Sequence, residues 1–280
     1  MQIKMLISSQ SPDLSASPAC DCHFHVFDAI NSTADARYVP RYSATLPDWS
    51  TRTQEVGVQR GVVVQPSFLG TDNRQLLAAL QRQPHALRGV AVVTPTATAA
   101  ELRAMHEAGI RGIRLNFFGA TDDAAVLRAL PSGWWTALLA ADMHLELHTD
   151  VGRVGALLPL VPSEIAVVLD HFAKPERIDG RDETVRVVCQ RNHSGSATYV
   201  TLSGPYRQAS ENRLRACELA TLWRDELGVY QLLWGSDWPC TNFEGHADYA
   251  ALHGALTNWL PSADDCLAVL SVNANRLYWR

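Results

Sequence analysis

Residues 61–65 read Gly-Val-Val-Val-Gln, a short run of β-branched residues that stops at Pro66. Nearly every position in it is apolar, which is typical of a strand covered on both faces, as strands in parallel sheets are. Comparable runs occur at 88–93, 165–169 and 230–234. The stretch therefore indicates a parallel sheet inside an α/β protein.

Strand candidates recur along the whole chain on either side of this run. We expect eight of them, at 20–27, 61–65, 88–93, 112–117, 143–148, 165–169, 198–202 and 230–234. Longer stretches with helical spacing lie between them, for example at 73–82, 99–108, 134–141 and 212–227. Eight strand–helix units in a chain of this length predict an α/β fold, a single (β/α)8 TIM barrel.

The barrel is expected to occupy most of the chain. Residues 1–18 are predicted to form a flexible N-terminal tail, and residues 19–280 the barrel, closed by one or two helices within 264–280. The alternative is an open doubly wound sheet, which normally carries a glycine-rich phosphate loop after its first strand. Neither GxGxxG nor GxxxxGK[ST] occurs in the chain, which favours the barrel.

The composition excludes several classes of protein. Lys plus Arg is 24 and Asp plus Glu is 29, so the net charge is −5, with 47% hydrophobic and 19% charged residues. A nucleic-acid-binding protein usually shows a basic excess, and a membrane-spanning helix needs about 18 or more apolar residues in a row. The sequence has neither feature, so we expect no nucleic-acid partner and no membrane span.

Other features bear on location and assembly. The six cysteines lack the dense spacing of a disulfide framework, and the apolar run near the N-terminus is too short for a signal peptide. We therefore expect reduced thiols and a cytoplasmic location. Trp134, Trp135 and Trp259 are candidates for the interface of a homodimer, although core packing explains them equally well.

The first predicted strand carries two histidines near its end, where a barrel places its active site. His23 and His25 share one face, because side chains alternate along a strand. They are either a metal-binding or catalytic pair, or two histidines that make ordinary hydrogen bonds. Cys20 and Cys22 fall on the opposite face, and we interpret them as small residues packed in the barrel wall rather than ligands of a soft metal.

The fourth predicted strand carries an arginine among apolar residues. Arg114 and Asn116 share a face of this strand. An unpaired guanidinium is costly to bury, so Arg114 either meets a carboxylate inside the barrel or binds an anionic ligand. The sequence leaves both alternatives open.

Three further strand candidates end in polar residues that suit a metal. Glu146 and His148 share a face of the fifth strand, His171 follows the sixth, and Asp237 follows the eighth. Any one of these is more often structural, but together with the first pair they form a set of imidazoles and a carboxylate. Such a set could hold one divalent ion such as Zn²⁺, with a position left open for water.

The motifs C-D-C-H-F-H-V-F-D, G-I-R-L-N-F, L-E-L-H-T, V-L-D-H-F-A-K-P and L-L-W-G-S-D-W-P together resemble the amidohydrolase superfamily, amidohydrolase-2 type. They are most similar to its lactonase branch, which includes 2-pyrone-4,6-dicarboxylate lactonases and sugar-acid lactonases. The resemblance runs from about residue 20 to residue 279. It implies a TIM barrel that hydrolyses a lactone ring.

The resemblance also implies roles for single residues. The metal ligands of the family correspond to His23, His25, His148 and Asp237, with His171 as a histidine that either supports the ligands from behind or polarises the substrate carbonyl. Asp237 is the implied general base. The pyrone enzymes of this branch resemble a metal-free variant and have a tyrosine at the position of His148. The histidine here is closer to the metal-binding pattern, so we expect a divalent ion (Zn²⁺) that is weakly held or absent.

The expected substrate-binding residues are of two kinds. Arg114, Lys174 and Arg207 are the candidate anion binders, and Tyr38, Ser67 and Tyr206 are expected to shape the pocket. The pyrone enzymes use a second arginine shortly after G-I-R-x-N-F, where this chain reads Phe118-Gly119-Ala120-Thr121. This departure weakens the specific assignment to a dicarboxylate.

The resemblance, together with these residues, thus implies a hydrolase that opens the lactone ring of a small carboxylate-bearing substrate, either 2-pyrone-4,6-dicarboxylate-like or a sugar-acid lactone. One alternative is a metal-dependent decarboxylase, a lyase on the same barrel, which needs a tightly bound ion and an aromatic carboxylate. Another is a non-catalytic carboxylate-binding barrel. Asp237 argues against the last, because an added carboxylate repels an anionic ligand.

Overall fold

The computed structural model describes residues 17–28, 32–33, 36, 38–208, 213–245 and 248–280. Most of the predicted tail (residues 1–16) and the first residue of the helix expected at 212–227 lie outside the described residues. The tail therefore stays a prediction.

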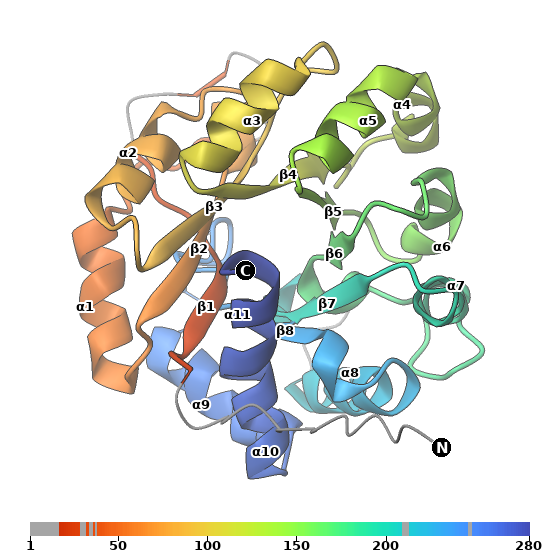
Figure 1. Cartoon of the computed structure of the whole chain (residues 1–280). Helices are drawn as coiled ribbons and strands as arrows, with labels where there is room; N and C mark the ends of the chain where they lie inside the picture. The colour runs from red at the N-terminus through yellow and green to blue at the C-terminus, as the bar shows by residue number, and fades with distance from the viewer. Residues whose placement is uncertain (1–16, 29–31, 34–35, 37, 209–212, 246–247) are drawn as a thin grey trace, which may run out of the picture.

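Eight parallel strands follow one another in chain order around a barrel (Figure 1). They are β1 (Cys20–Phe24), β2 (Arg60–Val64), β3 (Leu87–Ala91), β4 (Ile110–Asn116), β5 (His144–His148), β6 (Val167–Leu169), β7 (Thr198–Leu202) and β8 (Leu232–Trp234). Each overlaps one of the runs expected from the sequence, so the predicted TIM barrel is confirmed. The ring is completed beyond β8, where Asp237 N donates to His23 O and His25 N donates to Trp238 O, both at 2.8 Å.

Helices surround the barrel on its outside (Figure 1). The α-helices that precede the closing helices are α1 (Leu46–Val56), α2 (Arg74–Arg82), α3 (Ala99–Glu107), α4 (Asp123–Ala129), α5 (Ser132–Ala140), α6 (Val154–Leu157), α7 (Glu183–His193), α8 (Arg213–Glu226) and α9 (Tyr249–Trp259). Short turns are η2 (Ser67–Leu69), η3 (Leu158–Leu160), η4 (His171–Ala173), η5 (Pro205–Arg207) and η6 (Val229–Gln231). Thr45 with Asp48 and Thr98 with Glu101 form capping boxes that start α1 and α3.

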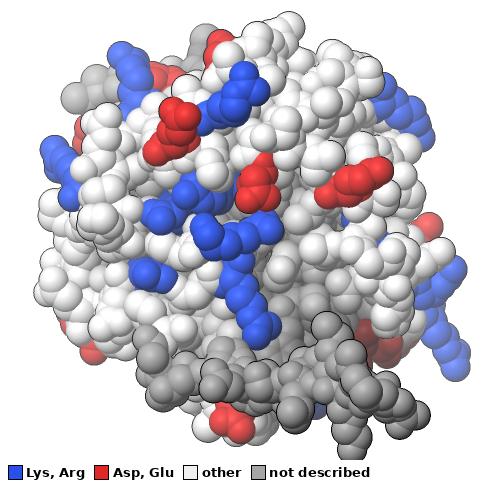
Figure 2. Space-filling model, viewed as in Figure 1, with Lys and Arg blue, Asp and Glu red and all other residues white. Residues whose placement is uncertain are grey.

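The chain ends in the predicted closing helices, α10 (Ala263–Leu267), η7 (Ala268–Val272) and α11 (Asn273–Tyr278). In Figure 1, α11 lies across the middle of the barrel. Arg88 Nε donates to Tyr278 O at 3.2 Å, and Arg60 donates to the Asn275 side chain, so α11 covers the N-terminal ends of the strands. Figure 2 shows this face, with Lys and Arg side chains gathered near its centre.

The core has two layers. One lies between the strands and the helices, and it includes Trp134 and Trp259, which are only 3% and 5% exposed. Core packing therefore explains these two tryptophans, and the predicted homodimer stays a prediction. The other layer fills the barrel and includes Cys20 and Cys22 with Tyr278. No described helix is both long and apolar enough to cross a membrane.

Strand β1 departs from simple alternation. Its register against β2 shifts between Asp21 and Phe24. As a result Cys22 and His23 both point into the barrel, while Phe24 stacks on Trp49 outside it. The prediction that the cysteines lie on the opposite face from His23 is therefore wrong, because a β-bulge breaks the two-residue period. All six cysteines are within the described residues and are free.

Candidate active site

A cavity of about 350 Å³ opens at the C-terminal ends of the strands. The side chains around it come from the ends of strands and from the loops that follow them, as is usual for a barrel. It is lined by His25, Tyr38, Pro66, Ser67, Phe68, Arg114, Asn116, Phe118, His148, His171, Arg207, Asp237, Thr241, Asn242 and Phe243. Of the predicted site residues, His23, Lys174 and Tyr206 are outside this lining but contact residues within it.

Asp237 follows β8 and has a left-handed backbone, with φ of 57°. Non-glycine residues adopt this conformation rarely, and often at functional sites. Its two carboxylate oxygens have different surroundings: Oδ2 accepts hydrogen bonds from Tyr206 OH at 2.7 Å and Arg207 Nε at 2.5 Å. Oδ1 is buried without a hydrogen-bond partner among the described residues.

The charge state of Asp237 follows from these neighbours. Burial alone would raise the pKa of this carboxyl, but the charges of Arg207 and then His171 outweigh it and hold the pKa well below its usual range. Asp237 is therefore ionised near neutral pH, which is the state a general base needs.

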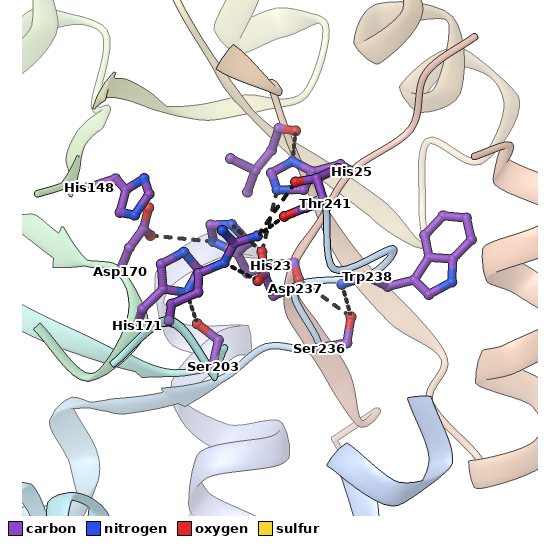
Figure 3. Close-up of polar contacts among 12 residues, drawn as sticks. His23, His25, His148, Asp170, His171, Ser203, Ser236, Asp237, Trp238 and Thr241 are labelled. Atoms are coloured by element: carbon purple, nitrogen blue, oxygen red, sulfur yellow. Dashed lines mark hydrogen bonds and ion pairs between the residues drawn. The ribbon is translucent and has the colours of Figure 1, made fainter. Parts of the chain in front are cut away.

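His25 and His23 aim ring nitrogens at the free oxygen of Asp237. Nε2 of His25 lies 3.6 Å and Nε2 of His23 lies 3.8 Å from Oδ1 (Figure 3). The Nδ1 atom of His25 lies 2.8 Å from Val64 O, a group that only accepts, so Nδ1 carries the proton and Nε2 the lone pair. Burial lowers the pKa of His25, which keeps this tautomer neutral.

A second polar cluster lies beneath the cavity. Arg114 contacts Asp170 Oδ2 through Nη2 at 2.6 Å and Glu146 Oε1 through Nε at 3.2 Å, and His23 Nδ1 lies 3.3 Å from Asp170 Oδ1. Arg114 has thus found carboxylates inside the barrel, while it also lines the cavity. Its role in binding substrate stays a prediction.

The pKa values of the ionisable groups in this cluster are strongly shifted. Burial and then Asp170 raise the pKa of Glu146 to about 8. Burial would also raise the pKa of Asp170, but Arg114 and then His23 hold it well below its usual range. Burial lowers the pKa of His23, yet Asp170 and Glu146 more than compensate and raise it overall. Near neutral pH the cluster therefore centres on an ionised Asp170 beside Arg114.

His171 stands at the start of a left-handed turn. The four residues His171 to Lys174 all have positive φ, between 43° and 58°, a conformation that costs L-residues roughly 1–2 kcal/mol each. Hydrogen bonds hold the turn: Gln208 Nε2 donates to His171 O and Trp223 Nε1 donates to Phe172 O, both at 2.8 Å. The turn directs His171 into the cavity, with Nδ1 at 2.9 Å from Ser203 Oγ.

Lys174 ends this turn and is almost wholly buried, with 1% exposure. Its Nζ lies 3.0 Å from His148 Nε2 and donates to Thr149 O at 3.0 Å. Burial and then Arg207 lower the pKa of Lys174 to about 8. Burial and then Lys174 lower the pKa of His148 well below its usual value, so this imidazole is neutral.

Two groups of side chains in the described structure have the spacing of a metal site: His23, His25 and Asp237, and His23, Asp170 and His171. The first fits an ion well, because His23 Nε2 and Asp237 Oδ1 are buried without hydrogen-bond partners. Metal–ligand bonds of about 2.0–2.2 Å place neighbouring ligand atoms roughly 3–3.5 Å apart, close to the separations seen here.

The predicted fourth ligand, His148, belongs to neither group. In Figure 3 it stands apart from His23, His25 and Asp237. Its Nε2 atom is in contact with Lys174 instead. The four predicted ligands therefore do not come together as one set in this structure.

Other predicted residues occupy the rim of the cavity. Tyr38 OH donates to Glu244 Oε1 at 2.5 Å, and Tyr42 OH donates to the same oxygen at 2.8 Å. Tyr38 and Ser67 line the cavity as expected, whereas Tyr206 contacts Asp237 from behind it.

The main residue that sequence reasoning missed is Asp170, which stands directly before His171 in the same quoted motif. The available signals were its place at the end of the sixth apolar run and the inward Arg114, since a buried guanidinium needs a carboxylate. Phe118 and Phe243 were also missed, and nothing in their local sequence marks them as lining the cavity.

Known proteins are similar to this chain over nearly its whole length. A family model described as Amidohydrolase matches residues 20–280. A 2-pyrone-4,6-dicarboxylate hydrolase of Comamonas testosteroni is 27% identical, with 93% of this chain and 90% of that protein covered. A 4-sulfomuconolactone hydrolase of Rhizobium radiobacter is 27% identical, with 80% of this chain and 77% of that protein covered.

A solved structure gives the same result. It is described as a probable 2-pyrone-4,6-dicarboxylic acid hydrolase from Acinetobacter baumannii with citric acid bound. It is 30% identical, covers 94% of this chain and 99% of that chain, and has a TM-score of 0.83. The family match thus includes all eight strands and every site residue described above.

Proposed function

The chain belongs to the amidohydrolase family, and from this premise we propose that it hydrolyses the ring ester of a small lactone that bears a carboxylate. The observation that carries the proposal is Oδ1 of Asp237, a buried carboxylate oxygen without a partner among the described residues, at the wall of the cavity. The lactone hydrolases among its relatives support the substrate class, either 2-pyrone-4,6-dicarboxylate-like or a sugar-acid lactone.

In the proposed reaction, Oδ1 of Asp237 takes a proton from a water molecule whose oxygen attacks the ring carbonyl. The carbon–oxygen bond of the ring then breaks, and Asp237 returns the proton to the departing ring oxygen. Nδ1 of His171 lies beside Ser203 Oγ. When Ser203 donates to Nδ1, the ring proton of His171 is on Nε2, which can then donate to the developing oxyanion. Preorganised donors of this kind usually provide the largest part of catalysis.

His23 completes the electrostatics from the other side. Its pKa is raised because Asp170 and Glu146 outweigh the effect of burial. When no ion is bound, the Nε2 of its imidazolium form can donate toward Oδ1 of Asp237, and in the neutral form its Nε2 can serve as a ligand.

We propose that His23, His25 and Asp237 hold a divalent ion such as Zn²⁺ weakly. When bound, such an ion acts as a Lewis acid and makes water easier to ionise. Metal content after purification without added metal tests this part: partial occupancy that dialysis against a chelator removes is expected, and a full complement that survives dialysis would contradict it.

Arg207 is the main proposed partner of the substrate carboxylate. Arg207 lines the cavity with Nε on Asp237 Oδ2 and Nη2 on Thr241 O at 3.0 Å. Arg114 provides positive charge from the floor of the cavity, and Lys174 provides it from behind His148. Tyr38 and Ser67 border the opening and are proposed to fit the ring.

Hydrolysis of a panel of lactones, with and without carboxylates, tests the function. Carboxylated lactones should be opened, and Asp237→Asn should lower kcat by roughly 10²–10⁴, because an amide cannot accept the proton. The matched control is Tyr206→Phe, which removes one hydrogen bond to Oδ2 and should change kcat far less. Loss of CO₂ from an aromatic carboxylate would favour the decarboxylase, and ligand binding without turnover would favour a binding barrel.

A further inference from the structure

Lys174 has three partners in the structure, and they account for all three protons of an ammonium group. Nζ lies 3.0 Å from His148 Nε2, 3.0 Å from Thr149 O and 4.6 Å from the centre of the Phe118 ring. A carbonyl oxygen and the face of an aromatic ring both favour a cation at this point. An ammonium group donates and never accepts, so the third partner, Nε2 of His148, must accept.

A neutral imidazole that accepts through one nitrogen carries its proton on the other. Nδ1 of His148 is buried and has no hydrogen-bond partner among the described residues. His148 also lines the cavity, and Phe118 stacks flat on its ring at a 3° angle, which fixes the ring plane. The unpaired group is therefore an N–H that awaits an acceptor.

We propose that Lys174 fixes His148 in its Nδ1–H tautomer, so that His148 is a hydrogen-bond donor to a bound substrate oxygen and is withheld from any metal ion. The inference deepens the proposed function and rests on it for the identity of that oxygen, a carbonyl or carboxylate of the lactone. Lys174 is thus a positioning residue that acts through His148.

The backbone explains how a lysine reaches this place. Lys174 ends the left-handed turn after β6 with φ of 43°, and its carbonyl accepts from Gly152 N at 2.9 Å. A right-handed continuation would carry the side chain elsewhere, because the hand of the turn sets its direction. The strained turn therefore serves two residues, His171 at its start and Lys174 at its end.

The same contact decides how many side chains can hold an ion. A ring nitrogen that already accepts from an ammonium group has no lone pair left for a metal. The fixed positive charge also repels a divalent cation at His148. His148 also lies outside both described groups of metal-site spacing, which leaves three protein ligands in the group with Asp237.

Zinc binding and the tautomer can both be measured without any substrate. Isothermal titration of the metal-free protein with zinc chloride compares wild type, His148→Phe, Lys174→Met and the matched control His25→Phe. We expect His148→Phe to leave the zinc Kd within about two-fold and His25→Phe to weaken it by about ten-fold or more. Lys174→Met should tighten it by about ten-fold, since the His148 lone pair is released.

Long-range ¹H–¹⁵N spectra of the ¹⁵N-histidine-labelled wild type, with His148→Phe to identify the signals, should show His148 protonated at Nδ1. A proton on Nε2 of His148, or weakening of zinc binding by His148→Phe as large as that by His25→Phe, would overturn the inference. The spectral result needs neither metal nor a folded Lys174→Met protein. If the protein does not hydrolyse lactones but the zinc titration and the spectra both give the expected results, the proposed function is refuted and this inference still stands.

Discussion

Nε of Arg207 lies 2.5 Å from Oδ2 of Asp237, and this ion pair makes the two oxygens of the carboxylate unlike. Oδ2 is occupied by Arg207 and Tyr206, whereas Oδ1 faces His23 and His25 without a hydrogen bond. A base that must take a proton from water needs one oxygen held and one oxygen open. The pair therefore orients the carboxylate as well as keeping it ionised.

Arg207→Met should raise the pKa of Asp237, because the charge that lowers it most against the effect of burial is removed. A carboxylate base is active above its pKa, so the acid limb of the profile of kcat/KM against pH should move to higher pH. At neutral pH, kcat/KM for acidic lactones should fall by roughly ten- to hundred-fold, the value of a charged hydrogen bond of about 1.5–3 kcal/mol. The pH profile of each variant measures both effects.

The control for this prediction is Arg207→Lys, which keeps the charge but loses the planar fork. It should leave the acid limb near its wild-type position while still weakening binding. If the acid limb of the pH profile does not move in Arg207→Met, its position is determined by a group other than Asp237.

The eight strands were predictable because covering both faces of a parallel strand leaves a run of apolar residues that stands out in the sequence. The inward direction of Arg114 and Asn116 followed from the two-residue period of β4, and both line the cavity. These are properties of single elements, and local sequence specifies them well.

The site was less predictable where the backbone departs from regular geometry. The bulge in β1 turns Cys22 and His23 to the same side, and four consecutive non-glycine residues form the left-handed turn that ends at Lys174. No residue pattern announces such a turn, since glycine, the usual sign of positive φ, is absent from it. The contact between Lys174 and His148 joins two loops and so depends on the closed barrel.

Arg114→Met should destabilise the protein strongly. Its guanidinium is buried between Asp170 and Glu146, and removing one partner of a buried ionic cluster costs about 3–5 kcal/mol because a charge is left uncompensated. Urea unfolding measures the change. The matched control is Arg74→Met, whose pair with Asp72 is exposed and should contribute less than about 1 kcal/mol; equal losses in the two variants would contradict the prediction.

Asp21 is a buried carboxylate that ties β1 to the loop carrying Asp237. Oδ1 accepts from Ser236 N at 2.9 Å and His23 N at 3.2 Å. Oδ2 accepts from Ser236 Oγ at 2.7 Å, Trp49 Nε1 at 3.0 Å and Tyr249 OH at 3.1 Å. His23 is itself one of these partners, and Asp237 follows Ser236 directly in the chain. Both carry the proposed chemistry, so Asp21 acts as a positioning residue.

Asp21→Asn should lower both stability and kcat, because an amide turns a donor toward other donors. We expect a loss of about 1–3 kcal/mol in the free energy of unfolding, together with a fall in kcat at nearly unchanged KM. Tyr249→Phe, which removes one hydrogen bond at the far side of Asp21, should cost only about 0.5–1.5 kcal/mol and leave kcat close to wild type. A purely structural role for Asp21 would lower stability in Asp21→Asn without changing kcat of the folded fraction.

His144 provides a prediction about stability at low pH. Its ring is buried at the start of β5, 5.4 Å from the ring of Tyr278, and it fills the space left by Gly112, where a Cβ would overlap it. Burial, and then the charge of Arg280, lowers the pKa of His144 to about 3. In the unfolded chain a histidine titrates near about 6.5. Between these two values the unfolded state binds a proton that the folded state does not.

The sign follows from linkage: stability falls as the pH falls from about 6.5 toward 3, and the contribution of His144 over that window is on the order of 4 to 5 kcal/mol. Buried His25, His148 and His171, whose pKa values are also lowered, add to the same slope. His144→Leu should therefore make the free energy of unfolding depend less steeply on pH, by the contribution of one histidine, whatever the substitution does to stability at pH 7. Urea unfolding in chelator at several pH values between about 4 and 7 measures the slope, and exposed His193→Leu is the matched control. A slope unchanged in His144→Leu would mean that His144 gains a proton in the folded protein.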